Sequence, residues 1–376
     1  MPTKPQVIVQ YYYPGASPSA PSYTVPSGLV QSVSYSSGRQ NITDQWQGGS
    51  ATIYGRSPSS LAQTPTIGQH IRLQVYNEYA IATYSGFISD YRVIYGKTTA
   101  YDTFEIAIES PFNLAGRATA TVTAVAGQST FTLAQNAGSA ITGTITYIAP
   151  VDGFTTTTSA QTYTEQVTSP LTDALNTDGG MMRERTYDSP PEFAPQTLIQ
   201  GHNSVNYGVA STTFTDVAAD PSSYVRYEEV QFYSAAYNYG TKVVVQAAGF
   251  ADQVSGSGSY SQTISTVNET ASQAANLAGY LKEKFNYAAT VPYAITYSGA
   301  ANTQEAIGWA SPEYVGYALV VKFRGNTYNC IIEGMSFTAN ATDYRATLYL
   351  SASLQNAFLR LDNSVYGKLD NNKLGF

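Results

Sequence analysis

Short runs in which apolar and polar residues alternate are the feature that most constrains this chain. The runs IRLQVY (71–76), FEIAIE (104–109) and RATLYL (345–350) repeat with a period of two. In a β-strand this period places the apolar side chains on one face. Turn residues separate successive runs, which is typical of antiparallel meanders rather than of βαβ units. The pattern therefore predicts a barrel or a sandwich.

The composition agrees with a mainly β fold. Only 12% of the residues are charged, and 32 Tyr stand against 14 Phe. Tyr, Thr, Val and Ile favour strands because branched and aromatic side chains pack well on a pleated surface. A chain poor in charge and rich in Tyr, Ser and Thr is typical of a protein whose surfaces become covered in a permanent assembly.

Composition also excludes several classes of protein. The 19 Lys and Arg are outnumbered by 26 Asp and Glu, so there is no basic footprint for holding nucleic acid. One Cys excludes a disulfide framework, and the two His, His70 and His202, lie far apart in the sequence. No apolar run approaches the ~18 residues of a membrane helix. We expect no cofactor, no metal, no stable membrane association and, without a secretory signal, folding in a cytoplasm.

One helix is predicted over residues 270–285. Its apolar residues form a single stripe at helical spacing, and Thr270 with Gln273 fits a capping box. Thr266 with Glu269 is a competing box. We expect this helix to pack as a wedge beside the last strands of the chain. The stripe consists of Ala274, Leu277, Ala278, Leu281 and Phe285.

Three other segments have weaker patterns. Residues 11–28 hold four Pro and no charge, which is typical of an extended arm. The Thr- and Ala-rich stretch around 129–150 predicts a hairpin with residues 136–138 in its turn. Residues 169–204 have no sustained period and predict a connector.

The strand-rich ends of the chain resemble each other, which favours an internal duplication. Each end has a Gly that leads out of a strand, an Asp that opens an alternating strand and an Arg that closes a short apolar segment. The spacing from Gly to Asp differs, but a change in hairpin length absorbs such a difference. The matched pairs are Gly86 with Gly334, Asp102 with Asp343, and Arg117 with Arg360.

Residues with catalytic potential are scattered. Glu105 and Glu109 share one strand face, and the simplest interpretation is that they form its solvent side. Cys330 lies among alternating apolar residues, which predicts a buried, inert thiol. His70 and His202 are expected to be surface or hydrogen-bonded residues rather than ligands. The dense Tyr residues, such as those at 11–13 and 224–239, suit protein interfaces or stacking on sugars.

Two motifs resemble a known family. The first is Gly38-Arg39, followed by a short hydrophobic and polar segment (42–46) and the strand GSATI (49–53). The second is the ending RLDNSVYGKLDNNKLGF (360–376), with its repeated Leu-Asp theme. Both resemble the minor tail proteins of long-tailed bacteriophages, at the corresponding ends of the chain. Together they cover about a ninth of the sequence, and residues 119–265 share no recognisable feature with the family.

The resemblance implies a tail hub, or baseplate hub, protein without enzymatic activity. Such hubs contain two tail-tube-type β-barrels and form trimers, so that six similar edges face a sixfold tail tube. It implies a homotrimer in the virion tail tip that is assembled in the host cytoplasm. The implied partners are the tail tube or distal tail protein, the tape-measure protein, and tail fibres or other tip proteins. Genome DNA would pass through the hub only in transit.

The expected fold class is therefore mainly β, with two tail-tube-like β-barrels, smaller β-rich insertions and one amphipathic helix. The predicted divisions are an N-terminal arm (1–28), a first tail-tube-like β-barrel (29–118), a β-hairpin insertion and connector (119–204), a small β domain (205–265), a helix with the second barrel (266–360) and a C-terminal docking segment (361–376). The candidate assembly contacts all lie in that last segment. They are Tyr366, Gly367, Leu369, Asp370, Leu374 and Phe376.

Two other functions remain open from the sequence. An adhesin would gather Tyr residues on one concave loop face to bind carbohydrate. A glycan hydrolase would need two carboxylates to converge in a cleft, one with a raised pKa. The candidates for that pair are Glu165, Asp173, Glu184 and Asp188.

Overall fold

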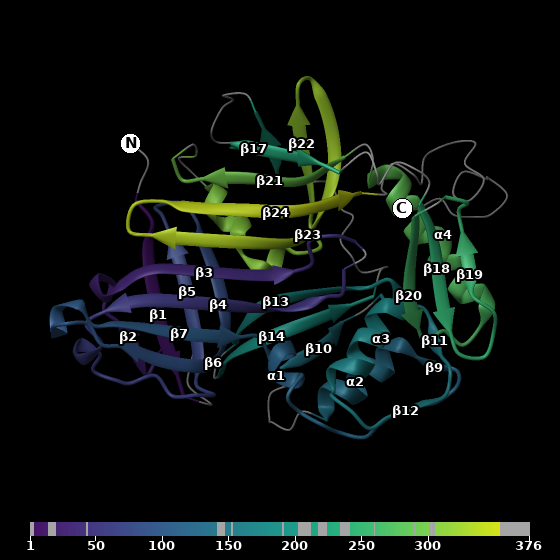
Figure 1. Ribbon diagram of the computed structural model, residues 1–376, viewed down its shortest axis with the longest axis horizontal. Coiled ribbons are helices and arrows are strands. Elements are labelled where there is room, and N and C mark those ends of the chain that lie inside the picture. Colours follow the sequence, from purple (N-terminus) through teal and green to yellow (C-terminus); the bar gives the residue numbers. More distant parts are fainter. Residues whose placement is uncertain are drawn as a thin grey trace.

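Strands from both ends of the chain join into one fourteen-stranded sheet in the computed structural model of this protein (Figure 1). The mainly β fold expected from the alternating runs is thereby confirmed. The structure describes residues 4–13, 20–42, 44–140, 147–151, 153–189, 192–201, 212–216, 224–233, 241–258, 260–288, 291–300, 302 and 305–353. No helix in these described parts is long and apolar enough to cross a membrane.

The first half of the large sheet comes from the N-terminal third of the chain. Its strands follow the order β3-β4-β7-β6-β5, and β1 and β2 extend the sheet beyond β5. The apolar residues of the predicted runs at 71–76 and 104–109 are buried on one face, as their alternation requires. The bounds are β1 (Gln6–Tyr12), β2 (Tyr23–Val25), β3 (Val30–Gly38), β4 (Gln47–Arg56), β5 (His70–Tyr76), β6 (Ile81–Ile94) and β7 (Thr103–Glu109).

The arm predicted for residues 1–28 is wrong where the structure describes it. β1 pairs along its whole length with β5, and β2 pairs with β1. Tyr11 and Tyr12 are fully buried. The uncharged, Pro-rich stretch had indicated an unpacked linker, but the apolar residues of β1 cover the end of the first core.

The second half of the sheet comes mostly from the C-terminal third. Its strands follow the order β17-β21-β24-β23-β22, and β15 and β16 continue beyond β22. The predicted small β domain at 205–265 is therefore divided, because β15, β16 and β17 belong to the large sheet. The bounds are β15 (Thr213–Thr215), β16 (Tyr224–Arg226), β17 (Glu229–Phe232), β21 (Pro292–Ser298), β22 (Ala318–Phe323), β23 (Asn326–Asn340) and β24 (Tyr344–Ala352).

The two halves have the same strand order, which supports the predicted duplication. β3, β4, β5, β6 and β7 correspond in turn to β17, β21, β22, β23 and β24. Each half also has a register shift at the same place, between Ile88 and Asp90 in β6 and between Ile332 and Gly334 in β23.

The shared register shift corrects one detail of the predicted duplication. It matches Gly334 with Asp90, so the predicted match with Gly86 is wrong by four residues. Alternation alone carries no marker of position along a strand, whereas a bulge does. Asp102 and Asp343 do each precede the corresponding strand, and Arg360 lies outside the described residues.

A third layer, from residues 111–200, packs beside the first half and corrects two predictions. The hairpin predicted around 136–138 is the helix α2, because the Ser129 side chain caps its first turn and Leu133, Ala134 and Ala137 are buried on one face. The predicted connector at 169–204 holds a helix and two paired strands.

The strands of this layer are short apart from one antiparallel pair, β13 with β14. β10 lies parallel to β14 on its other side. The bounds are α1 (Pro111–Ala115), β8 (Val122–Ala124), β9 (Gln128–Ser129), α2 (Thr130–Ser139), β10 (Ile148–Val151), β11 (Thr157–Thr158), β12 (Gln161–Tyr163), α3 (Thr168–Asp178), β13 (Met181–Ser189) and β14 (Glu192–Gln200).

The predicted amphipathic helix is confirmed as α4 (Ala271–Ala288), and the Thr270 side chain accepts a hydrogen bond from the backbone N–H of Gln273. The described side chains of its stripe, from Ala274 to Leu281, pack against a separate sheet of β18 (Thr241–Ala247), β19 (Gln253–Ser255) and β20 (Tyr260–Thr266). The predicted wedge beside the second half is therefore corrected: the stripe covers this small sheet, and only the C-terminal end of α4 reaches the large one (Figure 1).

Candidate functional site

The two halves of the large sheet meet where β3 pairs with β23, a contact that we call the joint. Seven antiparallel residue pairs form it, from Gly38 with Gly334 to Ser32 with Asn340. Gly38 has a φ of +83°, and a Cβ there would lie 2.4 Å from the Glu333 carbonyl oxygen. A Cβ on Gly334 would lie 2.5 Å from the Arg39 carbonyl oxygen. Both positions require glycine, because the backbones approach too closely for a side chain.

Stacked aromatic rings fill the buried side of the joint. Tyr35 of β3 stacks on Phe337 of β23, with ring centroids 4.7 Å apart. Tyr84 lies against the other side of Tyr35 at 5.5 Å, and Tyr344 lies against Phe337 at 5.9 Å. The Tyr35 hydroxyl donates a hydrogen bond of 2.8 Å to the Ala310 carbonyl. The two halves therefore share one continuous core at the joint.

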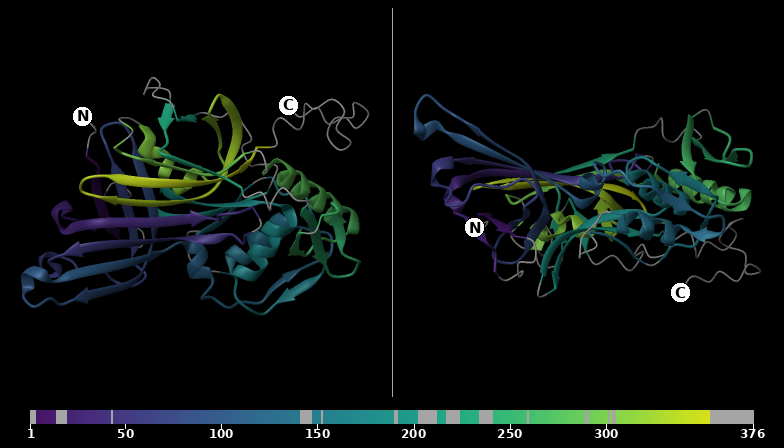
Figure 2. Two further views of the ribbon diagram at one scale, coloured as in Figure 1. Left: turned by 45° about the horizontal axis from the view of Figure 1, so that its top comes forward. Right: turned by 90° about the horizontal axis from the view of Figure 1, so that it is seen from below.

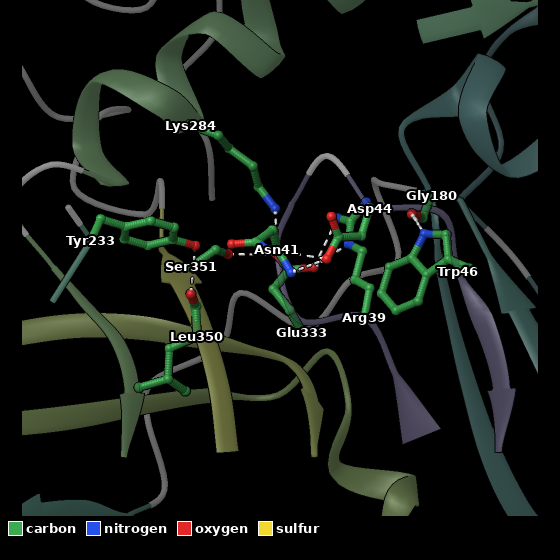
Figure 3. A network of polar contacts seen from close by, with 10 residues as sticks. All are labelled: Arg39, Asn41, Asp44, Trp46, Gly180, Tyr233, Lys284, Glu333, Leu350 and Ser351. Atoms are coloured by element: carbon green, nitrogen blue, oxygen red, sulfur yellow. Dashed lines mark hydrogen bonds and ion pairs between the residues drawn. The ribbon is translucent and has the colours of Figure 1, made fainter. Parts of the chain in front are cut away.

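A buried carboxylate closes one end of the joint (Figure 3). Glu333 lies at the register shift of β23 and is fully buried. Its two oxygens accept from Arg39 Nη2 at 2.8 Å and from Lys284 Nζ at 3.0 Å. The Ser351 hydroxyl also donates to it. Burial alone raises the pKa of Glu333, but the charges of Arg39 and Lys284 outweigh burial and hold the pKa at about 2.

This cluster connects four parts of the molecule. Arg39 follows β3, Glu333 belongs to β23 and Lys284 comes from the end of α4 (Figure 3). The Arg39 guanidinium lies 4.3 Å from the ring centroid of Trp46, whose indole N–H donates to the Gly180 carbonyl at 3.2 Å. Both sheet halves, the third layer and the α4 unit are thus tied together at one point.

The other face of the joint carries hydroxyl groups, and we call it the hydroxyl face. A row of Ser and Thr residues runs across β21, β24, β23, β3 and β4, each directly opposite the next: Thr296, Thr347, Ser336, Ser36 and Ser50. Because opposite residues share a sheet face, the same face continues onto Glu105 of β7 and Arg92 of β6. Eight consecutive strands, from β17 to β6, therefore present one surface.

A second buried carboxylate lies between the first half and the third layer. Glu184 of β13 accepts from the backbone N–H of Gly49 at 3.2 Å and from the Thr197 hydroxyl at 2.7 Å. Burial raises the pKa of Glu184 to about 7, even though these hydrogen bonds lower it. It lines a small cavity with Tyr84 and Arg185.

The carboxylates considered for a hydrolase have separate environments where the structure describes them. Glu165 is exposed, and Asp173 accepts a hydrogen bond from the Tyr163 hydroxyl at 2.8 Å. Burial raises the pKa of Asp173, which this hydrogen bond lowers. Glu184 has the partners given above, and the Asp188 side chain lies outside the described side chains. The described residues contain no group of three His, Cys, Asp or Glu side chains that could hold a metal.

The other described residues singled out from the sequence are buried or paired. Cys330 is buried, and burial raises the pKa of its thiol. His70 is buried at the start of β5, with Nε2 3.4 Å from the Tyr147 hydroxyl. Glu105 and Glu109 share one strand face, as predicted; it is the hydroxyl face, where they pair with Arg92 and Arg117.

Several candidates lie outside the described residues. His202 is one, and the six candidate assembly contacts, Tyr366, Gly367, Leu369, Asp370, Leu374 and Phe376, are the others.

Most of the described Tyr residues that were considered for sugar binding lie inside the protein. Tyr227 and Tyr233 are buried, and their hydroxyls donate to the carbonyls of Lys322 and Leu350. Tyr11 and Tyr12 are buried under the first half, whereas Tyr13 is exposed. Tyr therefore serves in these positions as a large core residue with a polar end.

Sequence reasoning missed the Glu333 cluster, although two signals were present. Glu333 interrupts an apolar run, CIIEGM (330–335). Lys284 lies three residues after Leu281 and so falls on the apolar stripe of α4. A charge on a buried face requires a partner, and these two residues are partners.

No protein-family model matches this chain, and no curated protein matches its sequence. Solved structures do share its fold. The tail protein from Neisseria meningitidis MC58 matches with a TM-score of 0.60 at 12% identity, covering 93% of this chain and 97% of that one. The 43 kDa tail protein of prophage MuSo2 from Shewanella oneidensis matches with a TM-score of 0.55 at 9% identity, covering 93% and 98%.

A secretion-system protein also matches over most of the chain. The E. coli c3393 protein, a component of the type VI secretion system with structural similarity to the T4 bacteriophage tail proteins gp27 and gp5, has a TM-score of 0.50 at 10% identity. The match covers 86% of this chain and 73% of that one. The chain therefore has the fold of phage tail proteins, which this secretion-system component shares.

Proposed function

We propose that this chain, which has the fold of phage tail proteins, is a structural virion protein that forms a trimeric hub at the tail tip. It acts by assembly rather than by catalysis. The observation that carries the proposal is the joint between two duplicated halves, because the same contact can be repeated between copies. The likeness to tail proteins over 93% of the chain supports the tail location.

The two outer edges of the eight-stranded surface are available for that repeat. Among the described strands, β17 pairs only with β21, and residues 90–94 of β6 pair only with β7. The duplication makes β17 the counterpart of β3, and this part of β6 the counterpart of the β23 segment in the joint. β17 of one copy therefore fits beside β6 of the next copy, as β3 fits beside β23 within the chain.

Repeating this contact in three copies gives a closed ring of six halves. A ring of twenty-four strands spaced about 4.8 Å apart has a circumference of about 115 Å and a backbone diameter of about 37 Å. Six similar halves match the sixfold symmetry of a tail tube. The hydroxyl face lines the ring, and the buried face with its third layer lies outside. The lumen then forms part of the channel for genome ejection.

The proposed partners follow from this arrangement. The tail tube or distal tail protein stacks on the ring, the tape-measure protein reaches its lumen, and fibres or other tip proteins attach outside. Figure 2 shows the β6–β7 hairpin standing away from the body, at the end opposite α4. Its tip exposes Ile94, Tyr95 and Tyr101, which suits a protein contact.

Native mass tests the trimer directly. We expect light scattering to give three times the chain mass of 40.4 kDa. A stable monomer with no larger species at high concentration would count against the ring.

Cross-linking tests the proposed edge pairing. The bulge-based alignment places Gln231 of β17 opposite Ile94 of the neighbouring copy, as Ser34 lies opposite Thr338 in the joint. We expect the variant Gln231→Cys/Ile94→Cys to form covalent trimers on oxidation, and no larger ladder. The control variant Gln231→Cys/Glu78→Cys, with one Cys in the β5–β6 turn, should remain monomeric on a non-reducing gel.

A further inference from the structure

The hydroxyl face contains arginines, which is unexpected for a surface that DNA must pass. Among the described arginines, four lie on it or beside it: Arg56, Arg92, Arg117 and Arg345. Unpaired arginines on such a wall would bind phosphates, because each phosphate contact releases counterions and adds to affinity. A channel wall that binds the phosphate backbone of DNA would oppose the sliding of the DNA.

Three of these arginines are paired with a glutamate on the same face. Arg92 of β6 lies directly opposite Glu105 of β7, and its Nε and Nη2 donate to one carboxylate oxygen at 3.1 and 2.5 Å. This pairing raises the pKa of Arg92. Arg117, two residues after α1, reaches back to Glu109 at 2.5 Å.

The third pair lies in the other half of the sheet. Arg345 of β24 and Glu229 of β17 lie 3.6 Å apart across the intervening strand β21. The fourth arginine, Arg56, donates its Nε to the Gly28 carbonyl at 3.1 Å. Charged pairs are thus present in both halves of the sheet, and the row of Ser and Thr residues runs across strands of both halves.

Stability does not account for these pairs. The arginine side chains are 57–60% exposed, and exposed ion pairs contribute little to folding. Their effect on the surface is larger, because each carboxylate places a negative charge beside an arginine. Glu105 and Glu109 also accept hydrogen bonds from guanidinium donors that would otherwise bind a phosphate. The Ser and Thr hydroxyls of the row are neutral, and those of Ser36 and Ser50 belong to exposed residues.

We infer that Glu105, Glu109 and Glu229 mask three arginines, so that the hydroxyl face does not bind the phosphate backbone of duplex DNA. This inference rests on the proposed function for the passage of DNA, but the masking itself is a property of the isolated protein. The inference makes Glu105, Glu109 and Glu229 responsible for a low affinity of the proposed channel wall for DNA.

The test removes the carboxylates and leaves the arginines. The variant Glu105→Gln/Glu109→Gln/Glu229→Gln is compared with the full-length wild type and with Glu78→Gln/Glu165→Gln/Asp252→Asn. Both variants change the formal charge from −7 to −4, but the control changes residues outside the hydroxyl face. The probe is a fluorescein-labelled DNA duplex of about 30 base pairs, followed by anisotropy from about 50 to 200 mM NaCl.

We expect only the first variant to bind the duplex. Three freed arginines predict a slope of about −2.7 in a plot of log affinity against log salt, which is a loss of roughly 40-fold over this range. Adding Arg92→Gln, Arg117→Gln and Arg345→Gln should abolish the gain. Single variants such as Glu105→Gln provide a milder test, with a slope of about −1.

Three results would overturn the inference: no duplex binding by the first variant, equal gains in both variants, or tight duplex binding by the wild type. The cross-linking experiment reports on the ring separately. A gain of DNA binding in the first variant, without covalent trimers in the cross-linking experiment, would support the masking and contradict the ring. Covalent trimers without a gain of DNA binding would support the ring and contradict the masking.

Discussion

Lys284 of α4 and Glu333 of β23 form an ion pair of 3.0 Å in which both side chains are buried. The pair connects the small α4 unit to the large sheet, and Arg39 completes it from the end of β3. Buried ion pairs contribute little net stability compared with apolar packing, but removing one partner is costly. Glu333 therefore connects these parts, and its loss would leave two positive charges without their partner.

Replacing the carboxylate tests this dependence. We expect Glu333→Gln to lower the free energy of unfolding by about 3–5 kcal/mol, because Arg39 and Lys284 would remain buried without a counter-charge. Chemical denaturation followed by circular dichroism measures the change. Glu105→Gln removes an exposed pair and serves as the matched control, with an expected change under about 1 kcal/mol. A similar small change for both variants would show that water reaches the cluster.

The same carboxylate predicts sensitivity to acid. The pKa of Glu333 is about 2 in the folded protein against an ordinary 4.5. A lowered pKa stabilises the folded state fully above about pH 4.5, and this contribution is lost as the pH falls toward 2. The loss amounts to about 3 kcal/mol. Denaturation at intervals from pH 6 to pH 2.5 should show a shallower decline for Glu333→Gln than for the wild type, and parallel curves would contradict the assignment.

Glu184 predicts the opposite dependence. Its pKa is raised from 4.5 to about 7, so the folded state holds a proton that the unfolded state releases. The stability of the wild type should therefore fall as the pH rises from about 4.5 to 7. We expect Glu184→Gln to match the wild type near pH 5 and to exceed it by about 3 kcal/mol at pH 8. Thermal unfolding at both values measures the difference, and an equal gain at both would exclude titration as its cause.

Local pattern predicted the strands and α4, because one period along a segment determines which side chains are buried. Period two located β5, β7 and β24, and the helical stripe located α4 with its Thr270 cap. The same reasoning failed for α2, whose Thr and Gly residues suit a strand and turn until the Ser129 cap and the burial of Leu133 and Ala137 are known. Tertiary burial there outweighed intrinsic preference.

Long-range contacts could not be read from the chain. The pairing of β3 with β23 joins residues about 300 positions apart, and nothing local to Gly38 indicates that the backbone of Glu333 will lie against it. The duplication predicted similar halves, but only the two bulges determine which residues of the halves correspond. Glu333 and Lys284 were each visible as a charge on an apolar face, and only the structure identifies them as partners.

The stacking of Tyr35 on Phe337 predicts how strongly the two halves are coupled. Tyr35→Phe keeps the ring but removes the hydrogen bond to Ala310, and we expect a loss of about 1 kcal/mol. Phe337→Leu keeps an apolar side chain but removes the stack. A double-mutant cycle of Tyr35→Leu with Phe337→Leu should give a coupling of about 0.5–1.5 kcal/mol, as for other aromatic pairs. Independent effects would mean that the joint depends on backbone pairing and burial alone, and that the edges of β17 and β6 could pair without an aromatic stack.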